Sequence, residues 1–292
     1  MRNFDEKGRL KSIANYKNGV PNGFAWRVIR GGGVIVGRVD SKGCLTGHRI
    51  AYLYPDFKTA FVGTFVDGCL EEAQAAKLRS VVDDRGIKIP YFTEPYGPTY
   101  KRDVSNFDHV TNDPLLPDPY ESSMVNIKLS KVEGAHDGLF VQNDVEPNTI
   151  LAFYNGKKLT TLEMHDAPTW DENSYRIFDP TRKCGTIDIP KKFIDFANYK
   201  ASLAHKTNHS FMPNAEFVVF DHPRFGLVPC VLATLDIKGG EEVFVHYGYE
   251  LDDCPDWYEA AWQLGDYPVP ETFTEWSYNV DEKKGIAIEA FI

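Results

Sequence analysis

The sequence predicts a mainly β protein that begins with a sheet of β-hairpins and ends with a helical segment. Glycines recur at a regular interval over the first 75 residues, and short strand-forming runs lie between turn signals in the second half. Residues 255–265 combine an early proline, a following glycine and an apolar helical face. A chain of 292 residues with 42% apolar content favours two domains over one.

The first 75 residues repeat a hairpin pattern. Gly19, Gly43 and Gly68 recur at an interval of about 24 residues. Strand-forming runs at 24–29 and 50–54 lie between these glycines. Each unit therefore predicts a hairpin that ends in a glycine turn, and stacked hairpins bury one face against the next.

This pattern resembles the MORN repeat, whose core is an aromatic-glycine hairpin of the YxxG type. The stretch Tyr16-Lys17-Asn18-Gly19 fits the motif, and Tyr54-Pro55-Asp56 fits it loosely. The resemblance implies a repeat domain over residues 1–75, in an array that is truncated at its start. A chance rhythm of glycines is the alternative interpretation.

Residues 76–117 are expected to connect the two domains. The stretch EEAQAAKLRSVVDD at 71–84 favours a short helix. The Pro- and Tyr-rich stretch at 90–100 has no helical or strand period and favours a connector. A regular pattern then resumes, so we place a second domain over 118–250 and a C-terminal helical segment with a tail over 251–292.

Composition and charge limit where in the cell the protein is expected and what kind of partner it binds. The charged start, MRNFDEKGRL, lacks the apolar core of a signal peptide, and no apolar run approaches the roughly 18 residues of a membrane span. The five cysteines include no CxxC pair, which indicates neither a disulfide framework nor a metal cluster. We expect an intracellular monomer, nuclear or cytoplasmic. The net charge of −10 argues against direct nucleic-acid binding and suits a basic peptide.

Four motifs follow one another in the second domain. They are the small-residue loop at 133–138, the strand at 149–154 with an Asn-Gly hairpin signal, the segment KTNHSFMPNA at 206–215, and the Gly-Gly turn at 239–240. Asn, Ser and Pro-Asn in the third motif are also ordinary turn residues. Asn208-His209-Ser210 matches an N-glycosylation sequon, which an intracellular chain would not use.

The order and spacing of these motifs resemble the SET domain of protein lysine methyltransferases over residues 118–262. The most specific pieces are Asn208-His209-Ser210-Phe211 through Asn214, and Gly240-Glu241-Glu242 followed by Tyr247-Gly248. With MORN-like repeats in front, the chain resembles the family that methylates lysine 4 in the histone H3 tail and lysines in other proteins. The resemblance implies several small β-sheets around a knot-like crossing, with S-adenosylmethionine as the cofactor.

The same resemblance assigns the cofactor-binding residues. The side chain of Asn208 would receive the ammonium of the cofactor's methionine part, and the backbone of His209 would pair with the adenine edge. Ala135 and Asp137 would clamp the methionine end. Trp257 in the C-terminal helix would pack on the cofactor, although structural packing alone is the alternative interpretation of this residue.

Aromatic residues form the substrate channel by the same resemblance. Tyr247 is the active-site tyrosine, Tyr154 is the second catalytic residue, and Tyr249 and Phe217 complete the channel walls. Each tyrosine is alternatively a half-buried strand residue. Only a neutral lysine amine can attack a sulfonium methyl, and a lysine with a pKa of about 10.4 is neutral only about once in a thousand molecules at physiological pH. An apolar channel beside a cation favours the neutral form.

Several positions depart from the family pattern. Phe217 stands where monomethylating relatives have tyrosine, which predicts dimethylation because the missing hydroxyl leaves room for another methyl; plain strand core is the alternative. His136 replaces the first glycine of a GxG loop, so we expect a different loop path. Asp137 is shorter than the family's glutamate. His246 stands at a usually small or acidic position and is expected to perturb nearby pKa values.

The segment 255–265 predicts a helix with Trp257, Ala261 and Leu264 on its apolar face. Cys254 is the single cysteine after residue 250, so no zinc is implied. Two other function classes stay open. One is a SET module that binds peptide or cofactor without turnover, and the other is an interaction protein whose repeats carry the function. Peptide specificity is expected in a groove around Trp170–Tyr175.

Overall fold

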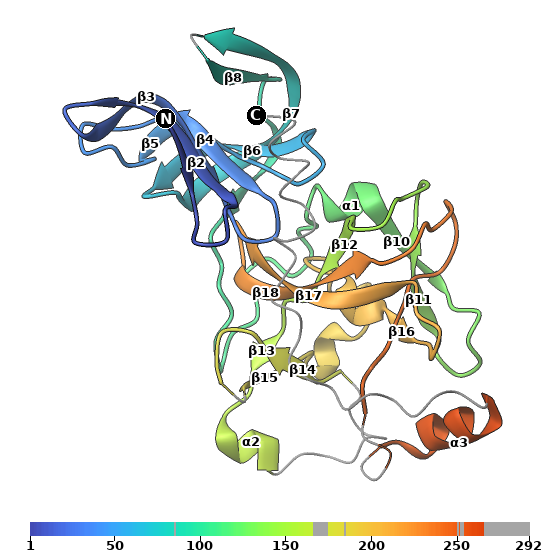
Figure 1. Cartoon of the computed structure of the whole chain (residues 1–292). Coiled ribbons are helices and arrows are strands. Elements are labelled where there is room, and N and C mark those ends of the chain that lie inside the picture. Colours follow the sequence, from blue (N-terminus) through green and yellow to red (C-terminus); the bar gives the residue numbers. More distant parts are fainter. Residues whose placement is uncertain (85, 166–174, 184, 250, 252–253, 266–292) are drawn as a thin grey trace. The chain divides into compact units, whose positions relative to one another are not determined.

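The computed structural model describes residues 1–84, 86–165, 175–183, 185–249, 251 and 254–265, which form two compact units. The first unit comprises Met1–Val104 and Phe220–Leu227. The second comprises Ser105–Val219 and the described residues from Val228 onward. Strands predominate in both units, which confirms the mainly β prediction (Figure 1).

A single antiparallel sheet makes up most of the first unit. Its nine described strands are β1 (Arg2–Phe4), β2 (Leu10–Lys17), β3 (Val20–Val28), β4 (Val34–Arg38), β5 (Gly47–Leu53), β6 (Thr59–Val66), β7 (Cys69–Asp84), β8 (Ile87–Phe92) and β9 (Tyr96–Lys101). From β1 to β8 each strand pairs with the next along the chain, and β9 pairs with β7.

The glycine rhythm marks hairpin turns, as expected. Asn18 and Gly19 have φ angles of 53° and 79° between β2 and β3. Asp67 and Gly68 have φ angles of 49° and 75° between β6 and β7. Two successive left-handed residues are typical of the type I′ turn, whose twist matches that of paired antiparallel strands. The repeat is therefore set by turn chemistry.

Alternating side chains fill the core of this sheet. Trp26 is fully buried, and its indole Nε1 donates a hydrogen bond of 2.6 Å to the Lys88 carbonyl. The buried residues clustered around it are aliphatic: Leu10, Ile13, Val34, Val36, Ala51, Leu53, Ala60 and Ile87. The strand-forming runs at 24–29 and 50–54 supply part of this cluster, as their period of two predicts.

Two expectations for the region after the repeats are wrong. Residues 71–84 lie in β7 and form no helix, and the expected connector at 90–100 contributes to β8 and β9. Glu and Ala favour a helix locally, but Ala73, Ala75 and Ala76 are buried in the sheet. Pairing of β7 with both β6 and β9 outweighs that local preference. The sheet therefore continues into the segment 76–117.

The second unit contains short strands in several small sheets. Its elements are α1 (Glu121–Met124), β10 (Val125–Leu129), β11 (Asp137–Val141), β12 (Ile150–Phe153), β13 (Lys157–Lys158), α2 (Thr161–His165), β14 (Ile177–Asp179), β15 (Gly185–Asp188), η1 (Lys191–Phe193), η2 (Ala204–Lys206), β16 (Asn208–His209), β17 (Ala215–His222), β18 (Gly226–Ala233), β19 (Phe244–Val245) and α3 (Asp256–Gly265). The sheets are β10-β11, β12-β18-β17, β13-β15-β14 and β16-β19. The last residues of β17 and the first residues of β18 fall within 220–227, which belong to the first unit. No described helix is long and apolar enough to cross a membrane.

Strand partners in this unit lie far apart in the sequence. β12 pairs with β18, and β16 pairs in parallel with β19. Because β12 takes β18 as its partner, Asn155-Gly156 closes no hairpin, contrary to expectation. Gly156 is instead needed for a close approach, since a Cβ there would lie 2.6 Å from the Asp188 carbonyl oxygen.

Candidate active site

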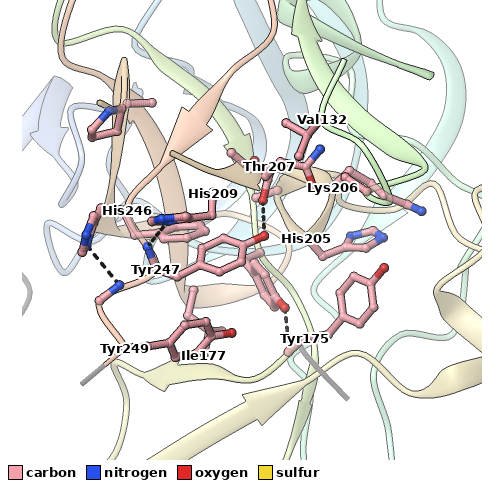
Figure 2. A pocket seen from close by; sticks show the side chains of 18 of the residues that line it. Val132, Tyr175, Ile177, His205, Lys206, Thr207, His209, His246, Tyr247 and Tyr249 are labelled. Carbon is pink, nitrogen blue, oxygen red and sulfur yellow. Dashed lines mark hydrogen bonds between the residues drawn. The ribbon is translucent and has the colours of Figure 1, made fainter. Parts of the chain in front are cut away.

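A cavity of about 1150 Å³ lies in the second unit. Its walls come from the loop between β10 and β11, the segment through η2 and β16, strand β17, the residues after β19, and α3. Figure 2 shows rings from residues 205–209 and 246–249 gathered around this space. The residues that the sequence assigned to the cofactor and the channel all line it: Ala135, Asp137, Tyr154, Asn208, His209, Phe217, Tyr247, Tyr249 and Trp257.

Asn208 and Glu242 link the two most specific sequence motifs. The Asn208 amide Nδ2 donates to Glu242 Oε1 at 3.0 Å, to Ser130 Oγ at 3.1 Å and to the Asp137 carbonyl at 3.0 Å. Glu242 is only 3% exposed and also accepts from Ser130 Oγ and Lys131 N. The N–H groups of the Asn208 amide are thus all bound within the protein. Its Oδ1, which makes no hydrogen bond to a described residue, is left to accept from a ligand.

A second asparagine completes this crossing. Asn214 Nδ2 donates to the Glu242 carbonyl at 2.9 Å, and Asn214 Oδ1 accepts from Phe244 N at 2.8 Å. The parallel pairing of β16 with β19 places Asn208 opposite Phe244. Asn208 and Asn214 of KTNHSFMPNA therefore bind the carboxylate and the backbone of the segment that begins at Glu242, which explains why the two motifs occur together.

The loop between β10 and β11 passes through His136 in a left-handed conformation. His136 has a φ of 58°, and its carbonyl accepts from Ser130 N at 2.7 Å. Glycine adopts this conformation without strain, whereas for a residue with a Cβ the left-handed conformation costs roughly 1 kcal/mol of conformational free energy. The histidine is thus held in a glycine-like conformation by the surrounding loop.

Lys206, the first residue of KTNHSFMPNA, is a site residue to which the sequence analysis gave no role. Its side chain is 5% exposed, and its Nζ lies 2.7 Å from Asp137 Oδ2 in the cavity wall. A lysine so deeply buried needs a charged partner, and Asp137 provides it. Its position two residues before Asn208 was visible in the sequence, but no spacing rule distinguished it from a surface lysine.

Both tyrosines predicted to be catalytic donate their hydroxyl protons to backbone carbonyls. Tyr247 Oη donates to the Thr207 carbonyl at 2.9 Å, and Tyr154 Oη donates to the Tyr175 carbonyl at 2.6 Å. Burial raises the pKa of both phenols well above the usual value of tyrosine. Both phenols therefore stay neutral, and their oxygens keep lone pairs that can accept hydrogen bonds.

Aromatic rings extend the wall around these hydroxyls. The Phe217 ring centroid lies 6.1 Å from that of Tyr154, edge to face. The Tyr249 ring stands edge to face with Tyr247 at 5.7 Å, and burial raises the pKa of Tyr249 to about 12. Such a wall offers little solvation to a charged ammonium, which is the property that the sequence predicted for a lysine channel.

Two histidines accept hydrogen bonds from the backbone around Tyr247. Tyr247 N donates to His209 Nδ1, and Gly248 N donates to His246 Nδ1, each at 3.1 Å. Burial, and to a smaller extent the neighbouring His246, lower the pKa of His209 to about 3. Burial also lowers the pKa of His246. The expected influence of His246 on a nearby pKa is confirmed.

Comparison with known proteins decides the family. One family model, described as the SET domain, matches residues 136–248, and another, described as the N-terminal region of the histone H3 K4-specific methyltransferase SET7, matches residues 16–87. A protein of Halocynthia roretzi named histone-lysine N-methyltransferase SETD7 is 35% identical over 291 residues, or 96% of this chain and 73% of that protein. This chain belongs to the SET-domain protein lysine methyltransferases. It is an enzyme of the class that uses S-adenosylmethionine.

Two solved structures resemble the methyltransferase more weakly. One is titled "ctPRC2 in an autoinhibited conformation bound to S-adenosylmethionine". Its sequence identity to this chain is 21% and its TM-score is 0.35, and the match covers 49% of this chain and 17% of the chain in that structure. The other, an active polycomb repressive complex 2 in the basal state, has 22% identity, a TM-score of 0.33, and coverage of 43% and 15%. This chain thus spans about a sixth of their length, and scores this low add nothing to the argument.

The C-terminal helix of the methyltransferase is confirmed as α3, but its predicted apolar face is wrong. Trp257 is 46% exposed and lines the cavity, Ala261 is exposed and Leu264 is 88% exposed, whereas Tyr258 is fully buried. Tyr258 is buried because its hydroxyl finds a polar partner in His246, 3.2 Å away, while its ring packs on neighbouring aromatics. Helical periodicity alone does not detect such a partner.

His205 and Tyr175 are further cavity residues that the motifs missed. Neither ring nitrogen of His205 has a hydrogen-bond partner among the described residues, and burial lowers its pKa to about 3. Within the expected peptide groove, Tyr175 lines the cavity, whereas Trp170 and residues 171–174 lie outside the described residues. The described part of the chain contains no cluster of three or more His, Cys, Asp or Glu residues suited to a metal.

Proposed function

We propose that this methyltransferase modifies a lysine in a basic peptide such as the histone H3 tail, and lysines in other proteins. The observation that carries the proposal is that one cavity is lined both by Asn208 and by the phenols of Tyr154 and Tyr247. Residues 105–292 hold 31 Asp and Glu against 15 Lys and Arg, a net charge of −16 that attracts a basic substrate. The name of the Halocynthia relative makes a histone peptide the first substrate to test.

S-adenosylmethionine, when bound, supplies a methyl group on a positively charged sulfur. Asn208 Oδ1, which has no partner among the described residues, is our candidate to accept from the cofactor's ammonium. The backbone of His209 would pair with adenine, the loop of Ala135 and Asp137 would hold the methionine end, and the half-exposed ring of Trp257 would cover the cofactor. These residues fit the cofactor because they offer an acceptor, a turn of backbone and a flat apolar surface within one cavity.

Lys206 adds a cation for the cofactor's carboxylate. Its Nζ already pairs with Asp137, whose side chain is exposed, so a bound carboxylate would share the ammonium through a charge-assisted hydrogen bond. The pairing also suggests the alternative function, a SET module that binds cofactor or peptide without turnover, if Asp137 holds Lys206 away from the ligand.

The channel tyrosines are proposed to orient the substrate amine and not to deprotonate it. Their raised pKa values disfavour a phenolate base, and their donated protons leave oxygen lone pairs for the N–H groups of a neutral amine. Neutralising a lysine at physiological pH costs roughly 4 kcal/mol in water. The aromatic walls lower this cost because they desolvate the ammonium, whose proton leaves to water before the amine is enclosed.

Phe217 is proposed to permit dimethylation. Its ring lies in the cavity wall 6.1 Å from Tyr154 and offers no hydroxyl to hold the monomethylated amine in one orientation. Mass spectrometry after exhaustive reaction should find dimethyl peptide for the wild type and mainly monomethyl peptide for Phe217→Tyr. Monomethyl peptide alone from the wild-type enzyme would refute the assignment.

Transfer of radiolabelled methyl to histone H3 and to a mixed protein extract tests the function. We expect labelled lysine from the wild type and a loss of at least about a hundredfold in Tyr247→Phe, with S-adenosylhomocysteine still bound. Calorimetry that detects S-adenosylhomocysteine binding without any transfer would favour the alternative function. We also infer a monomer in the nucleus or cytoplasm, and light scattering during gel filtration should give about the chain mass of 33.1 kDa.

A further inference from the structure

His246 makes two hydrogen bonds with different neighbours. Its Nδ1 accepts from Gly248 N at 3.1 Å, and its Nε2 lies 3.2 Å from Tyr258 Oη. A ring nitrogen that accepts an N–H bond carries no proton, so the proton of the neutral ring is on Nε2. Nε2–H therefore donates to the Tyr258 hydroxyl. One side chain thus contacts both the backbone beside Tyr247 and the helix α3.

The first of these bonds holds the backbone around Tyr247. The two peptide N–H groups that flank its Cα are both bound by imidazole rings, Tyr247 N by His209 and Gly248 N by His246. Gly248 has a φ of 71°, and an acceptor side chain two residues earlier closes this left-handed turn as an Asx side chain does. With Tyr247 Oη fixed on the Thr207 carbonyl, these bonds determine where the phenol lies.

The second bond reaches the wall that contains Trp257. Tyr258 is fully buried, with its ring centroid 4.8 Å from that of His209 and 4.9 Å from that of Phe211. Trp257, the preceding residue of α3, lines the cavity with its ring centroid 6.4 Å from that of Tyr247. The hydroxyl of Tyr258 is therefore the polar anchor of the helical turn that presents Trp257.

We propose that His246 is a positioning residue that couples the docking of α3 to the orientation of Tyr247. The inference rests on the proposed roles of Tyr247 in the channel and of Trp257 beside the cofactor. The hydrogen bond from Gly248 N to His246 Nδ1 affects the rate of methyl transfer, because it helps to orient the phenol of Tyr247. The hydrogen bond between His246 Nε2 and Tyr258 Oη affects cofactor affinity, because it holds α3 in place. A ring that only filled space would not separate the two effects.

Three variants separate the two bonds. His246→Ala removes both and should lower kcat about fivefold and weaken S-adenosylhomocysteine binding about fivefold, the usual effect of one hydrogen bond on each quantity. His246→Asn keeps an acceptor for Gly248 N but does not reach Tyr258, so it should recover most of kcat and none of the affinity. Tyr258→Phe should weaken binding about fivefold and lower kcat by less than about twofold.

Steady-state kinetics and calorimetry on the full chain measure these quantities, and thermal unfolding verifies that each variant is folded. Equal losses of kcat in the Ala and Asn variants would overturn the Nδ1 role. An unchanged Kd in Tyr258→Phe would overturn the α3 role. If His246→Ala does not fold, the Asn and Phe variants carry the test.

The Tyr247→Phe variant distinguishes this inference from the proposed function. If Tyr247→Phe is fully active, the role of Tyr247 fails and the proposed coupling fails with it. If Tyr247→Phe is inactive while the His246 and Tyr258 variants match the wild type, the assignment of Tyr247 stands and only the coupling is refuted.

Discussion

The two units of this methyltransferase are built from contacts of different range. In the first unit each strand from β1 to β8 pairs with its successor, across turns such as Asn18-Gly19. In the second unit, Asn208 bonds to Glu242, 34 residues later, and to Ser130, 78 residues earlier. Local turn chemistry therefore specifies the sheet, whereas long-range polar contacts specify the cavity.

Charge also divides the chain. Residues 1–104 contain 17 Lys and Arg against 11 Asp and Glu, a net charge of +6, while residues 105–292 carry −16. The whole-chain charge of −10 conceals this opposition. The argument for a basic substrate therefore applies to the second part of the chain, which contains the cavity, and says nothing about partners of the repeat sheet.

The largest expected effect concerns the crossing in the second unit. Glu242→Ala removes a buried acceptor, leaves the donors on Ser130 Oγ and Lys131 N unpaired and takes one of three acceptors from Asn208, which should cost about 4 kcal/mol of unfolding free energy. Binding of S-adenosylhomocysteine should be weakened with it, because Asn208 loses one of the three acceptors that hold its side chain. Urea unfolding and calorimetry measure both.

The adjacent Glu241 provides a matched control. It is exposed, and its carboxylate accepts only from Lys238 N among its described hydrogen bonds, so Glu241→Ala should cost less than about 1 kcal/mol. Equal destabilisation by the two substitutions would show that the crossing does not depend on the Glu242 carboxylate.

A substitution in the first unit should affect stability and leave the cavity alone. A Cβ at Gly63 would lie 2.2 Å from the Glu72 carbonyl oxygen in the neighbouring strand, so Gly63→Ala should cost about 3 kcal/mol. Gly19→Ala meets no neighbour and strains only a φ of 79°, at about 1 kcal/mol. Both variants should bind S-adenosylhomocysteine as the wild type does. Weaker binding in Gly63→Ala would show that the sheet and the cavity are energetically coupled.

Acid should destabilise the second unit through its buried histidines. Burial lowers the pKa of His205 and His209 to about 3, so below about pH 6.5 the unfolded chain binds protons that the folded chain does not. Stability should fall from pH 6.5 towards 3, by about 2 kcal/mol per histidine at pH 5. Urea unfolding at pH 7 and pH 5 measures the loss, which should shrink by about 2 kcal/mol in His205→Gln. An equal loss in both proteins would contradict the assignment.

The sequence predicted features that depend on local signals. Glycine turns located the hairpins, and the spacing of the Asn-His-Ser and Gly-Glu-Glu motifs located residues that line one cavity, whose individual roles stay predictions. Features that depend on a distant partner were missed. The Ala-rich segment 71–84 favours a helix by itself and becomes a strand only between β6 and β9. Likewise, Lys206 is a site residue only because the fold brings Asp137 to it.

The smallest effect contrasts a strained residue at the cavity with the turn glycines of the sheet. His136 has a φ of 58°, so His136→Gly should relieve about 1 kcal/mol of backbone strain in the folded protein. Part of this gain in stability is offset, because glycine has more conformational freedom in the unfolded chain. We expect a net gain of about 0.5 kcal/mol in thermal unfolding. His136→Ala keeps the left-handed cost and should show no gain. If the alanine variant is the more stable of the two, a Cβ at this position does not strain the loop.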